Sequence, residues 1–314
     1  MNFITFTELN RAITENLHRI PEDVDLVVGV PRSGILVATL IALQRNLPVT
    51  DIHSLASGRL HGTGSTRQRA NWVDTPQAAR HLLLVDDSVS TGAAMKEARK
   101  IVQDLELPAK VTTLAPYVLP TSFRRVDVHF RVVNHPRLFE WNYLHHYAME
   151  HACVDIDGVL CEDPRWRDND DGERYEHFIA NARPRLLPTK PVGSVVTSRL
   201  ERYRELTEAW LERHGIIYRD LVMMDGVTAR ERRIQGGHGQ FKAEAYQRSG
   251  CALFIESNYA QAVEICRVAR RPVFSIEGST LIEPHGLGPH LQMLANDWRI
   301  TVKQTVRKLA QRFG

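Results

Sequence analysis

Short apolar runs alternate with helix-like stretches through the N-terminal half of the chain. Val, Ile and Leu dominate these runs, as they do in strands that are buried on both faces; the runs cover residues 25–30, 49–55, 81–85 and 111–118. Helical patterns follow at residues 35–44 and from about residue 93 to about residue 105. Strands that alternate with helices predict an α/β domain with a mainly parallel sheet flanked by helices.

The same pattern restarts near residue 150. Strands are predicted at residues 152–156, 192–196, 221–224 and 252–255, and helices at 201–214, 241–249 and 259–270. We therefore predict two Rossmann-like α/β domains, over residues 1–148 and 149–314. Residues 298–313 predict an amphipathic helix that is packed or solvated, with nucleic-acid or partner binding as the alternative.

Composition and charge narrow the class of protein. The 314 residues are 43% hydrophobic and 25% charged, which excludes a disordered or low-complexity chain. The formal charge of +3 is spread along the chain, so a nucleic-acid partner is not indicated. The longest apolar run, residues 35–43, is too short to span a membrane, and the N-terminus lacks a secretory signal. Four cysteines without a CxxC pair fit reduced thiols, so we expect a cytoplasmic protein without a membrane partner.

The sequence LLLVDDSVSTGAA carries the first candidate site. An apolar strand leads to two carboxylates, Asp86 and Asp87, which could accept hydrogen bonds from vicinal hydroxyls. The loop that follows runs into a helix N-terminus, where backbone N–H groups favour a phosphate; its residues are Ser88, Ser90, Thr91, Gly92 and Ala93. Phosphate at one side and a diol at the other suggest a ribose 5-phosphate. The alternative is an ordinary strand–loop–helix junction with an Asp as helix cap.

This segment resembles the phosphoribosyl-pyrophosphate motif of type I phosphoribosyltransferases. VGVPRSG resembles the pyrophosphate loop of the same family, in which Arg32 and the backbone around Ser33 and Gly34 would hold pyrophosphate with Mg²⁺. Taken alone, PRSG could equally be a turn with a solvated Arg. The resemblance implies transfer of phosphoribosyl to a nitrogenous base, with release of pyrophosphate, by a homo-oligomer.

Two further segments have counterparts in that family. Residues 57–76 match the position of its flexible catalytic loop, with a disordered basic loop as the alternative; the lid candidates are Arg59, His61, Arg67 and Arg69. The sequence PRLFEWNYLHH matches the position of the hood that stacks on the base, with interdomain packing as the alternative; the aromatic candidates are Phe139, Trp141 and Tyr143.

VDIDGVLCED carries the second candidate site, with two aspartates at the end of a buried strand. Asp155 can attack a phosphoryl group as a nucleophile. Asp157 can protonate the leaving group and then activate water. The segment resembles the first motif of haloacid-dehalogenase-like phosphohydrolases, which implies phosphomonoester hydrolysis through an aspartyl-phosphate. A calcium loop is the alternative, but the third acid and closing Glu of an EF-hand are missing.

Three later segments match the order of that family's further motifs. By resemblance, Thr197 would bind the phosphoryl group and Lys242 would neutralise its charge. Glu256 and Asn258 could complete a Mg²⁺ site with Asp155 and the backbone carbonyl of Asp157, although the family commonly carries aspartates at this point. Few residues separate the first two motifs, so the cap is small, and residues 230–239 form a substrate loop or a connector.

The two resemblances predict a bifunctional enzyme that converts a base to a nucleotide and, where the two activities act in sequence, the nucleotide to a nucleoside. Two other classes remain open. One is a regulator that senses phosphoribosyl pyrophosphate without turning it over. The other is an active transferase with a degenerate phosphatase domain as scaffold.

Overall fold

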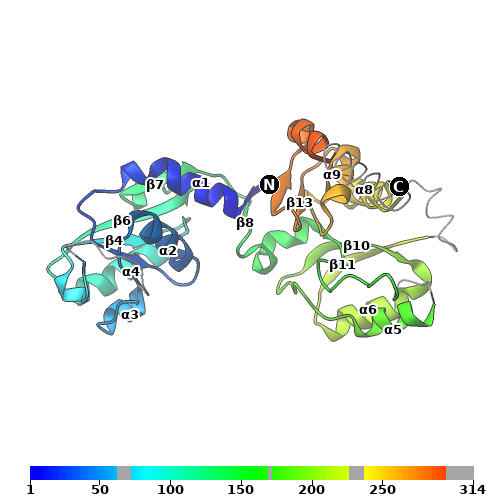
Figure 1. Ribbon diagram of the computed structural model, residues 1–314, viewed down its shortest axis with the longest axis horizontal. Helices are drawn as coiled ribbons and strands as arrows, with labels where there is room; N and C mark the ends of the chain where they lie inside the picture. The colour runs from blue at the N-terminus through cyan, green and yellow to red at the C-terminus, as the bar shows by residue number, and fades with distance from the viewer. Residues whose placement is uncertain (62–71, 169–171, 226–236, 295–314) are drawn as a thin grey trace, which may run out of the picture. The chain divides into compact units, whose positions relative to one another are not determined.

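The computed structural model describes residues 1–61, 72–168, 172–225 and 237–294 (Figure 1). The chain divides into an N-terminal unit, residues 2–137, and a C-terminal unit that starts at Leu138. The segment 138–148, expected at the end of the first domain, therefore belongs to the second. The predicted α/β class with mainly parallel sheets is confirmed in both units. The predicted helix at 298–313 lies outside the described residues.

The N-terminal unit is built on one six-stranded sheet whose pairings are all parallel. Its strands lie in the order β3 (Val49–Asp51), β2 (Leu26–Gly29), β4 (His81–Val85), β6 (Lys110–Val118) and β5 (Ser88–Val89), and β7 (Val128–Val132) also pairs with β6. Its helices are α1 (Phe6–Asn16), α2 (Ser33–Arg45), α3 (Ile52–Ala56) and α4 (Ala93–Asp104). Alternate strand residues such as Leu26, Val28, Leu82 and Leu84 share one core with α3 and α4, and α1 and α2 cover the other face.

Two local signals explain where this unit departs from the expected elements. The run 49–55 was expected as one strand, but β3 ends at Asp51, whose carboxylate accepts from the N–H groups of His53 and Ser54 and caps α3. Helix α1 was not predicted, although Thr5 and Glu8 form a capping box at its start.

The C-terminal unit contains a second six-stranded sheet. Its strands lie in the order β11 (Tyr218–Met224), β10 (Val192–Leu200), β9 (Ala152–Val154), β12 (Leu253–Glu256), β13 (Val273–Ser275) and β14 (Thr280–Ile282). Only the pairing of β13 with β14 is antiparallel among the described strands of this sheet. Its helices are α5 (Glu173–Asn181), α6 (Arg204–Arg213), α8 (Gly237–Ser249) and α9 (Tyr259–Ala269).

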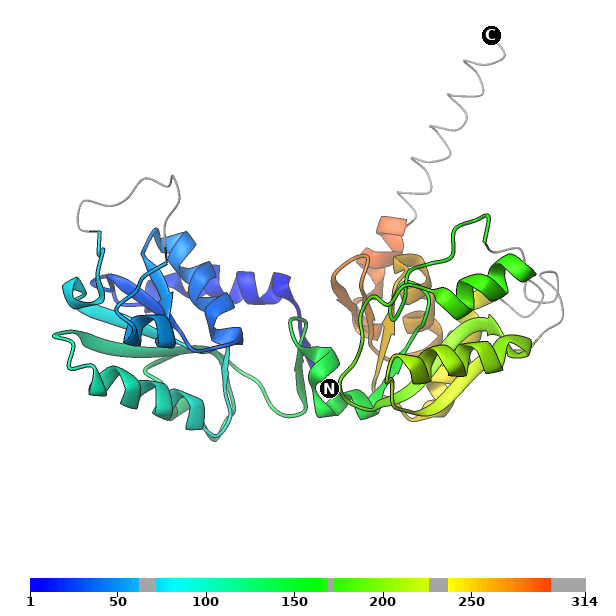
Figure 2. The same ribbon diagram turned by 90° about the horizontal axis from the view of Figure 1, so that it is seen from below.

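Helices cover both faces of this second sheet (Figure 2). Helices α8 and α9 share a core with Val196 and Phe254, whereas α5 and α6 pack together beside Leu200 and Met223. The short strands β1 (Asn2–Ile4) and β8 (Arg137–Phe139) lie outside both six-stranded sheets. None of the helices in the described ranges combines the length and the apolar character that crossing a bilayer requires.

The strand order places both candidate sites where parallel sheets generally bind ligands. In the first sheet, β2 lies between β3 and β4, and in the second, β9 lies between β10 and β12. The connections on either side of such a strand run in opposite directions, which opens a crevice at the carboxyl ends. The predicted loops begin at these ends, after β2 and β4 in one unit and after β9, β10 and β12 in the other.

Candidate active sites

The structure brings the two candidate loops of the N-terminal unit together. Gly29 at the end of β2 pairs in register with Val85 at the end of β4, and the Val30 N–H donates to the Val85 carbonyl at 2.8 Å. A Cβ at Gly34 would lie 2.6 Å from the Val85 carbonyl oxygen and 3.0 Å from the Asp86 Cα. Only a glycine lets the PRSG loop approach this closely. The loop with Arg32 and Ser33 is thus held against the start of the acidic pair.

The acidic pair is compact and partly withdrawn from solvent. The Asp87 N–H donates to Asp86 Oδ1 at 2.8 Å. Burial raises the pKa of Asp86 to about 7, the neighbouring Asp87 charge adds to the shift, and the Arg137 guanidinium opposes it. The pair can therefore accept hydrogen bonds from vicinal hydroxyls, most fully above neutral pH.

The phosphate-loop candidates form an open helix N-terminus. Gly92 caps α4 in the left-handed region, with φ of 77°, and no side chain caps the helix. The Ala93 N–H donates to Thr91 Oγ1 in a long hydrogen bond of 3.4 Å, and Ser90 Oγ lies 3.5 Å from His135 Nε2. Ser88 lies just before this loop, in β5. The first N–H groups of a helix have no partner within the helix, which suits an anion such as a phosphate.

The described residues include only two of the four lid candidates, and the aromatic residues expected to form the hood belong to the C-terminal unit. Arg59 and His61 lie along β3, since the Arg59 carbonyl accepts from Thr50 Oγ1 at 2.9 Å and the His61 N–H donates to the Val49 carbonyl at 3.1 Å. Arg67 and Arg69 lie outside the described residues. In the C-terminal unit, Phe139 stacks on Trp141 at 4.8 Å and Tyr143 meets Phe274 edge-on at 5.7 Å. Their stacking on a base stays a prediction.

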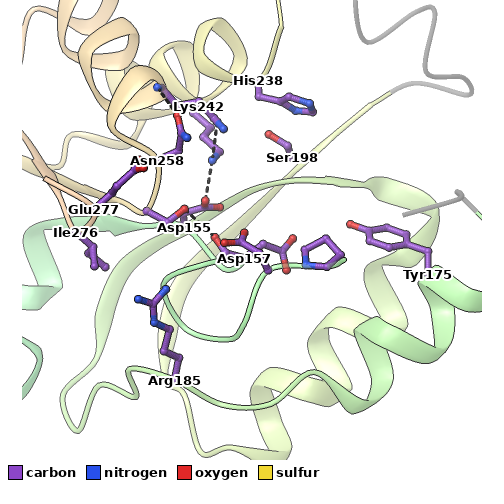
Figure 3. A pocket seen from close by; sticks show the side chains of 14 residues that line it. Asp155, Asp157, Tyr175, Arg185, Ser198, His238, Lys242, Asn258, Ile276 and Glu277 are labelled. Carbon is purple, nitrogen blue, oxygen red and sulfur yellow. Dashed lines mark hydrogen bonds and ion pairs between the residues drawn. The ribbon is translucent and has the colours of Figure 1, made fainter. Parts of the chain in front are cut away.

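A cavity of about 630 Å³ lies at the carboxyl ends of β9, β10 and β12 (Figure 3). The predicted Asp155, Asp157 and Lys242 line it. Sequence reasoning missed several other lining residues, among them Asp163, Tyr175, Arg185, His238 and Glu277. Asp163 closes the quoted motif VDIDGVLCED and His238 lies within the segment 230–239, so these two had a sequence signal. Tyr175, Arg185 and Glu277 come from separate elements without a shared motif.

Lys242 joins two carboxylates beneath this cavity. Its Nζ donates to Asp155 Oδ2 and to Glu256 Oε2, both at 2.7 Å, and to Gln261 Oε1 at 3.1 Å. Burial raises the pKa of Asp155 well above its usual value, and the Lys242 ammonium opposes that shift. Burial lowers the pKa of Lys242, but Asp155 and Glu256 outweigh it and raise that pKa above the ordinary range. Lys242, Asp155 and Glu256 therefore form one buried cluster of ion pairs. A role for Lys242 toward a phosphoryl group stays a prediction.

Asp157 has a partner that sequence reasoning missed. Arg199 at the end of β10 donates from Nη2 to Asp157 Oδ1 at 2.6 Å and from Nε to Oδ2 at 3.2 Å. The Arg199 side chain is fully buried, so this bidentate pair fixes the direction of the carboxylate. Arg199 stands two residues after Thr197, and that proximity was the available signal.

The end of β10 presents Ser198 rather than Thr197 to the cavity. Thr197 is fully buried, and its Oγ1 accepts from the Arg199 N–H at 3.2 Å. Ser198 lines the cavity, and its buried hydroxyl has no hydrogen-bond partner within the described parts of the chain. Successive side chains leave a strand on opposite faces, so the two hydroxyls have different surroundings. Ser198 is thus the better placed of the two to contact a phosphoryl group.

The carboxylates expected to bind Mg²⁺ do not form an open ligand set. Glu256 is fully buried and does not line the cavity; Lys242 occupies its Oε2, and Ser257 Oγ and the Asn258 N–H occupy its Oε1. The Asp157 backbone carbonyl, another expected ligand, accepts from Ser257 Oγ at 3.2 Å. No group of three or more His, Cys, Asp or Glu side chains suited to a metal occurs in the ranges that the structure describes. Glu256 is therefore closed off from the cavity, and its part in a magnesium site stays a prediction.

Comparison with known proteins follows the division into units. No profile of a protein family matches the chain. HGPRTase-like protein 1 of Haloarcula marismortui is 30% identical over 104 residues, which cover 31% of this chain and 57% of that protein. Orotate phosphoribosyltransferase of Halorhodospira halophila is 31% identical over 100 residues, covering 31% of this chain and 44% of that protein. Transcriptional regulator GfcR of Methanocella arvoryzae is 30% identical over 95 residues, covering 29% and 45% respectively.

The N-terminal half resembles type I phosphoribosyltransferases. The chain spans about half the length of the curated relatives that it matches. Among solved structures, purine phosphoribosyltransferase from Pyrococcus horikoshii Ot3 is 18% identical with a TM-score of 0.32, and covers 45% of this chain and 92% of its own. Helicobacter pylori xanthine-guanine-hypoxanthine phosphoribosyltransferase is 13% identical with a TM-score of 0.34, and the match covers 45% of this chain and 91% of that protein.

Proposed function

We propose that the N-terminal unit transfers phosphoribosyl from phosphoribosyl pyrophosphate to a nitrogenous base. The observation that carries this proposal is the contact between the two loops, in which Gly34 packs against Val85 and Asp86. It puts a loop suited to pyrophosphate beside carboxylates suited to ribose hydroxyls, and both lie on one sheet edge with the open N-terminus of α4.

In this reaction the side chains bind and orient rather than form covalent bonds. Asp86 and Asp87 accept from the ribose hydroxyls, and the loop before α4 binds the 5-phosphate. A ring nitrogen of the base bonds to the anomeric carbon while the bond to pyrophosphate breaks, and the proton of that nitrogen passes to solvent. Arg32 offsets the charge that develops on the pyrophosphate. Mg²⁺, in this proposal, enters as the counter-ion of the pyrophosphate group and so as part of the substrate.

The C-terminal unit is proposed to hydrolyse a phosphomonoester. The support is the cavity with a buried carboxylate, Asp155, held by a buried ammonium, Lys242. An Asp155 oxygen attacks phosphorus, the ester bond breaks, and Asp157 gives a proton to the leaving oxygen. Asp157 then takes a proton from water, which attacks phosphorus and releases phosphate from Asp155. Arg199 keeps the Asp157 carboxylate in one orientation for both transfers.

A screen of bases with phosphoribosyl pyrophosphate and Mg²⁺ tests both halves when pyrophosphate and phosphate are measured separately. The double variant Asp86→Asn/Asp87→Asn should lose pyrophosphate release and keep hydrolysis of a generic phosphomonoester. Asp155→Asn should do the reverse. Wild-type rates in the variant that is expected to fail would overturn the corresponding assignment. If added base produces a nucleoside as well as pyrophosphate, the two steps act in sequence.

The similarity to GfcR regulators supports a second candidate for the N-terminal unit. In that case the site binds phosphoribosyl pyrophosphate as a signal and does not turn it over. Tight binding without pyrophosphate release with any base in the screen would favour this regulator. If the wild-type chain hydrolyses no phosphomonoester, a scaffold role for the C-terminal unit is favoured.

A further inference from the structure

The loop before α4, residues 90–92, is called the phosphate loop below because it is proposed to bind the 5-phosphate. The helical turn Phe123–Arg125 lies next to it and carries two consecutive arginines, Arg124 and Arg125. Both are exposed, but their contacts differ. The Arg124 guanidinium lies over the Phe123 ring, 5.4 Å from its centre. Arg125 Nη1 instead donates to the backbone carbonyl of Thr91, within the phosphate loop.

The turn that carries Arg125 is firmly attached to the strand before the loop. The buried Ser122 hydroxyl donates to the Val89 carbonyl at 3.0 Å and accepts from the Leu119 N–H at 3.0 Å. The Arg125 N–H then donates to the Ser122 carbonyl at 3.0 Å. The backbone of Arg125 is thereby fixed relative to Val89, two residues before Thr91, so its side chain reaches the loop from a defined point.

The contact with Thr91 determines which way the next N–H points. The peptide bond between Thr91 and Gly92 is not among the cis bonds of the chain, and in a planar trans peptide the C=O and N–H point in opposite directions. When Arg125 holds the Thr91 carbonyl on its own side, the Gly92 N–H must point away from Arg125. In the described residues that N–H has no acceptor, so it is available to an anion at the start of α4.

Gly92 leaves the space that this arrangement needs. A Cβ at Gly92 would lie 3.0 Å from Arg125 Cδ, and the positive φ of 77° would strain any other residue. The Arg125 stem thus lies across the glycine, on the side of the loop that carries the Thr91 carbonyl.

We infer that Arg125 is a positioning residue for the 5-phosphate of the sugar substrate, an inference that rests on the proposed transferase function. It binds the Thr91 carbonyl and so keeps the N–H groups at the start of α4 aimed at the phosphate. Pyrophosphate, which the separate loop with Arg32 is proposed to hold, does not depend on it.

The test measures binding of ribose 5-phosphate, phosphoribosyl pyrophosphate and inorganic pyrophosphate to the full chain by calorimetry. In Arg125→Gln, the Kd for ribose 5-phosphate should rise roughly tenfold, the effect expected from one charge-assisted hydrogen bond. Arg125→Lys should recover part of the affinity, because an ammonium can still donate to the Thr91 carbonyl. The Kd for pyrophosphate should stay unchanged. In the catalytic reaction, KM for phosphoribosyl pyrophosphate should rise more than kcat falls.

Arg124→Gln is the matched control, since it removes the same charge one residue away. If Arg124→Gln and Arg125→Gln weaken ribose 5-phosphate equally, the effect is general electrostatics and the inference is overturned. Equal loss of pyrophosphate affinity in Arg125→Gln, or a lowered melting temperature that accounts for it, would overturn it too. A wild-type chain that binds neither sugar phosphate would instead refute the proposed transferase function, and the inference with it.

Discussion

Replacing Lys242 with Met should lower the free energy of unfolding of the C-terminal unit by several kcal/mol, because it leaves two buried carboxylates without their cationic partner. Lys242 is 3% exposed, and its Nζ lies 2.7 Å from both Asp155 and Glu256, which are equally withdrawn from solvent. Removal of one partner from a buried ion pair costs about 3–5 kcal/mol. Since Lys242 neutralises two carboxylates, we expect a loss near the upper end, about 5 kcal/mol at pH 8.

The loss should depend on pH with a definite sign. Burial already raises the pKa of Asp155, and without the ammonium the attraction that opposes that shift is lost. A carboxyl whose pKa is higher in the folded than in the unfolded state binds more protons when folded, so stability falls as pH rises through that interval. The deficit of Lys242→Met relative to wild type should therefore be smaller at pH 5 than at pH 8.

Urea unfolding of the full chain, followed by circular dichroism at both pH values and fitted with one transition per unit, measures this deficit. Arg248→Gln, which removes an exposed charge from the same helix, is the control and should change stability little. Lys242→Met/Glu256→Gln should recover part of the loss, because one stranded carboxylate becomes a neutral amide. A Lys242→Met chain within about 1 kcal/mol of wild type at pH 8 would refute the buried ion-pair cluster, since breaking such a cluster costs several times more.

Three further perturbations probe other contacts. Gly34→Ala puts a Cβ 2.6 Å from the Val85 carbonyl, so the loop must shift; pyrophosphate release should fall about 100-fold, with phosphomonoester hydrolysis as the unchanged control. Arg199→Lys cannot grip both oxygens of Asp157, and hydrolysis should slow about tenfold or more; an unchanged rate contradicts the orienting role. Asp86→Asn removes a carboxyl whose pKa is raised by burial to about 7, so the variant should melt higher than wild type at pH 8 and lose that advantage at pH 5. If Asp86→Asn and the wild type melt at the same temperature at pH 8 and also at pH 5, the burial of that charge is contradicted.

Most strands of the two six-stranded sheets could be predicted from short stretches of sequence. Runs such as 81–85 and 111–118 are apolar throughout, since helices cover both faces of a parallel sheet. The strands β13 and β14 were not predicted, because each has three residues, too few to show a period, and neither leads into a recognisable motif as the equally short β9 does. The run 49–55 misled for a different reason, because the capping carboxylate of Asp51 turns its second half into a helix.

The boundary between units could not be predicted from local pattern. The segment 138–148 follows the last strand of the first unit, and its aromatic residues suggested a hood over a base. In the structure Tyr143 packs on Phe274, and Glu140 accepts from Ser279, both far along the chain. Which core buries an apolar segment depends on the free energy of burial against distant residues, and sequence spacing does not record that.

The sequence by itself determined where the chemistry-bearing loops begin. Asp86, Asp87, Asp155 and Asp157 directly follow strands, and the sequence shows this because each pair comes after an apolar strand-like run. Parallel strands place their carboxyl ends at one edge of the sheet, so these loops lie where ligands bind. The glycines of these loops are also local signals, as the positive φ of Gly92 shows.

Only the tertiary structure decided which side chains meet. It paired Arg199 with Asp157 and Lys242 with Glu256, turned Ser198 rather than Thr197 toward the cavity, and laid Arg125 against the phosphate loop. The physical reason is that a buried charge or donor must find its partner wherever the fold provides one, at any separation along the chain. Strand direction then decides which neighbour faces the cavity and which faces the core.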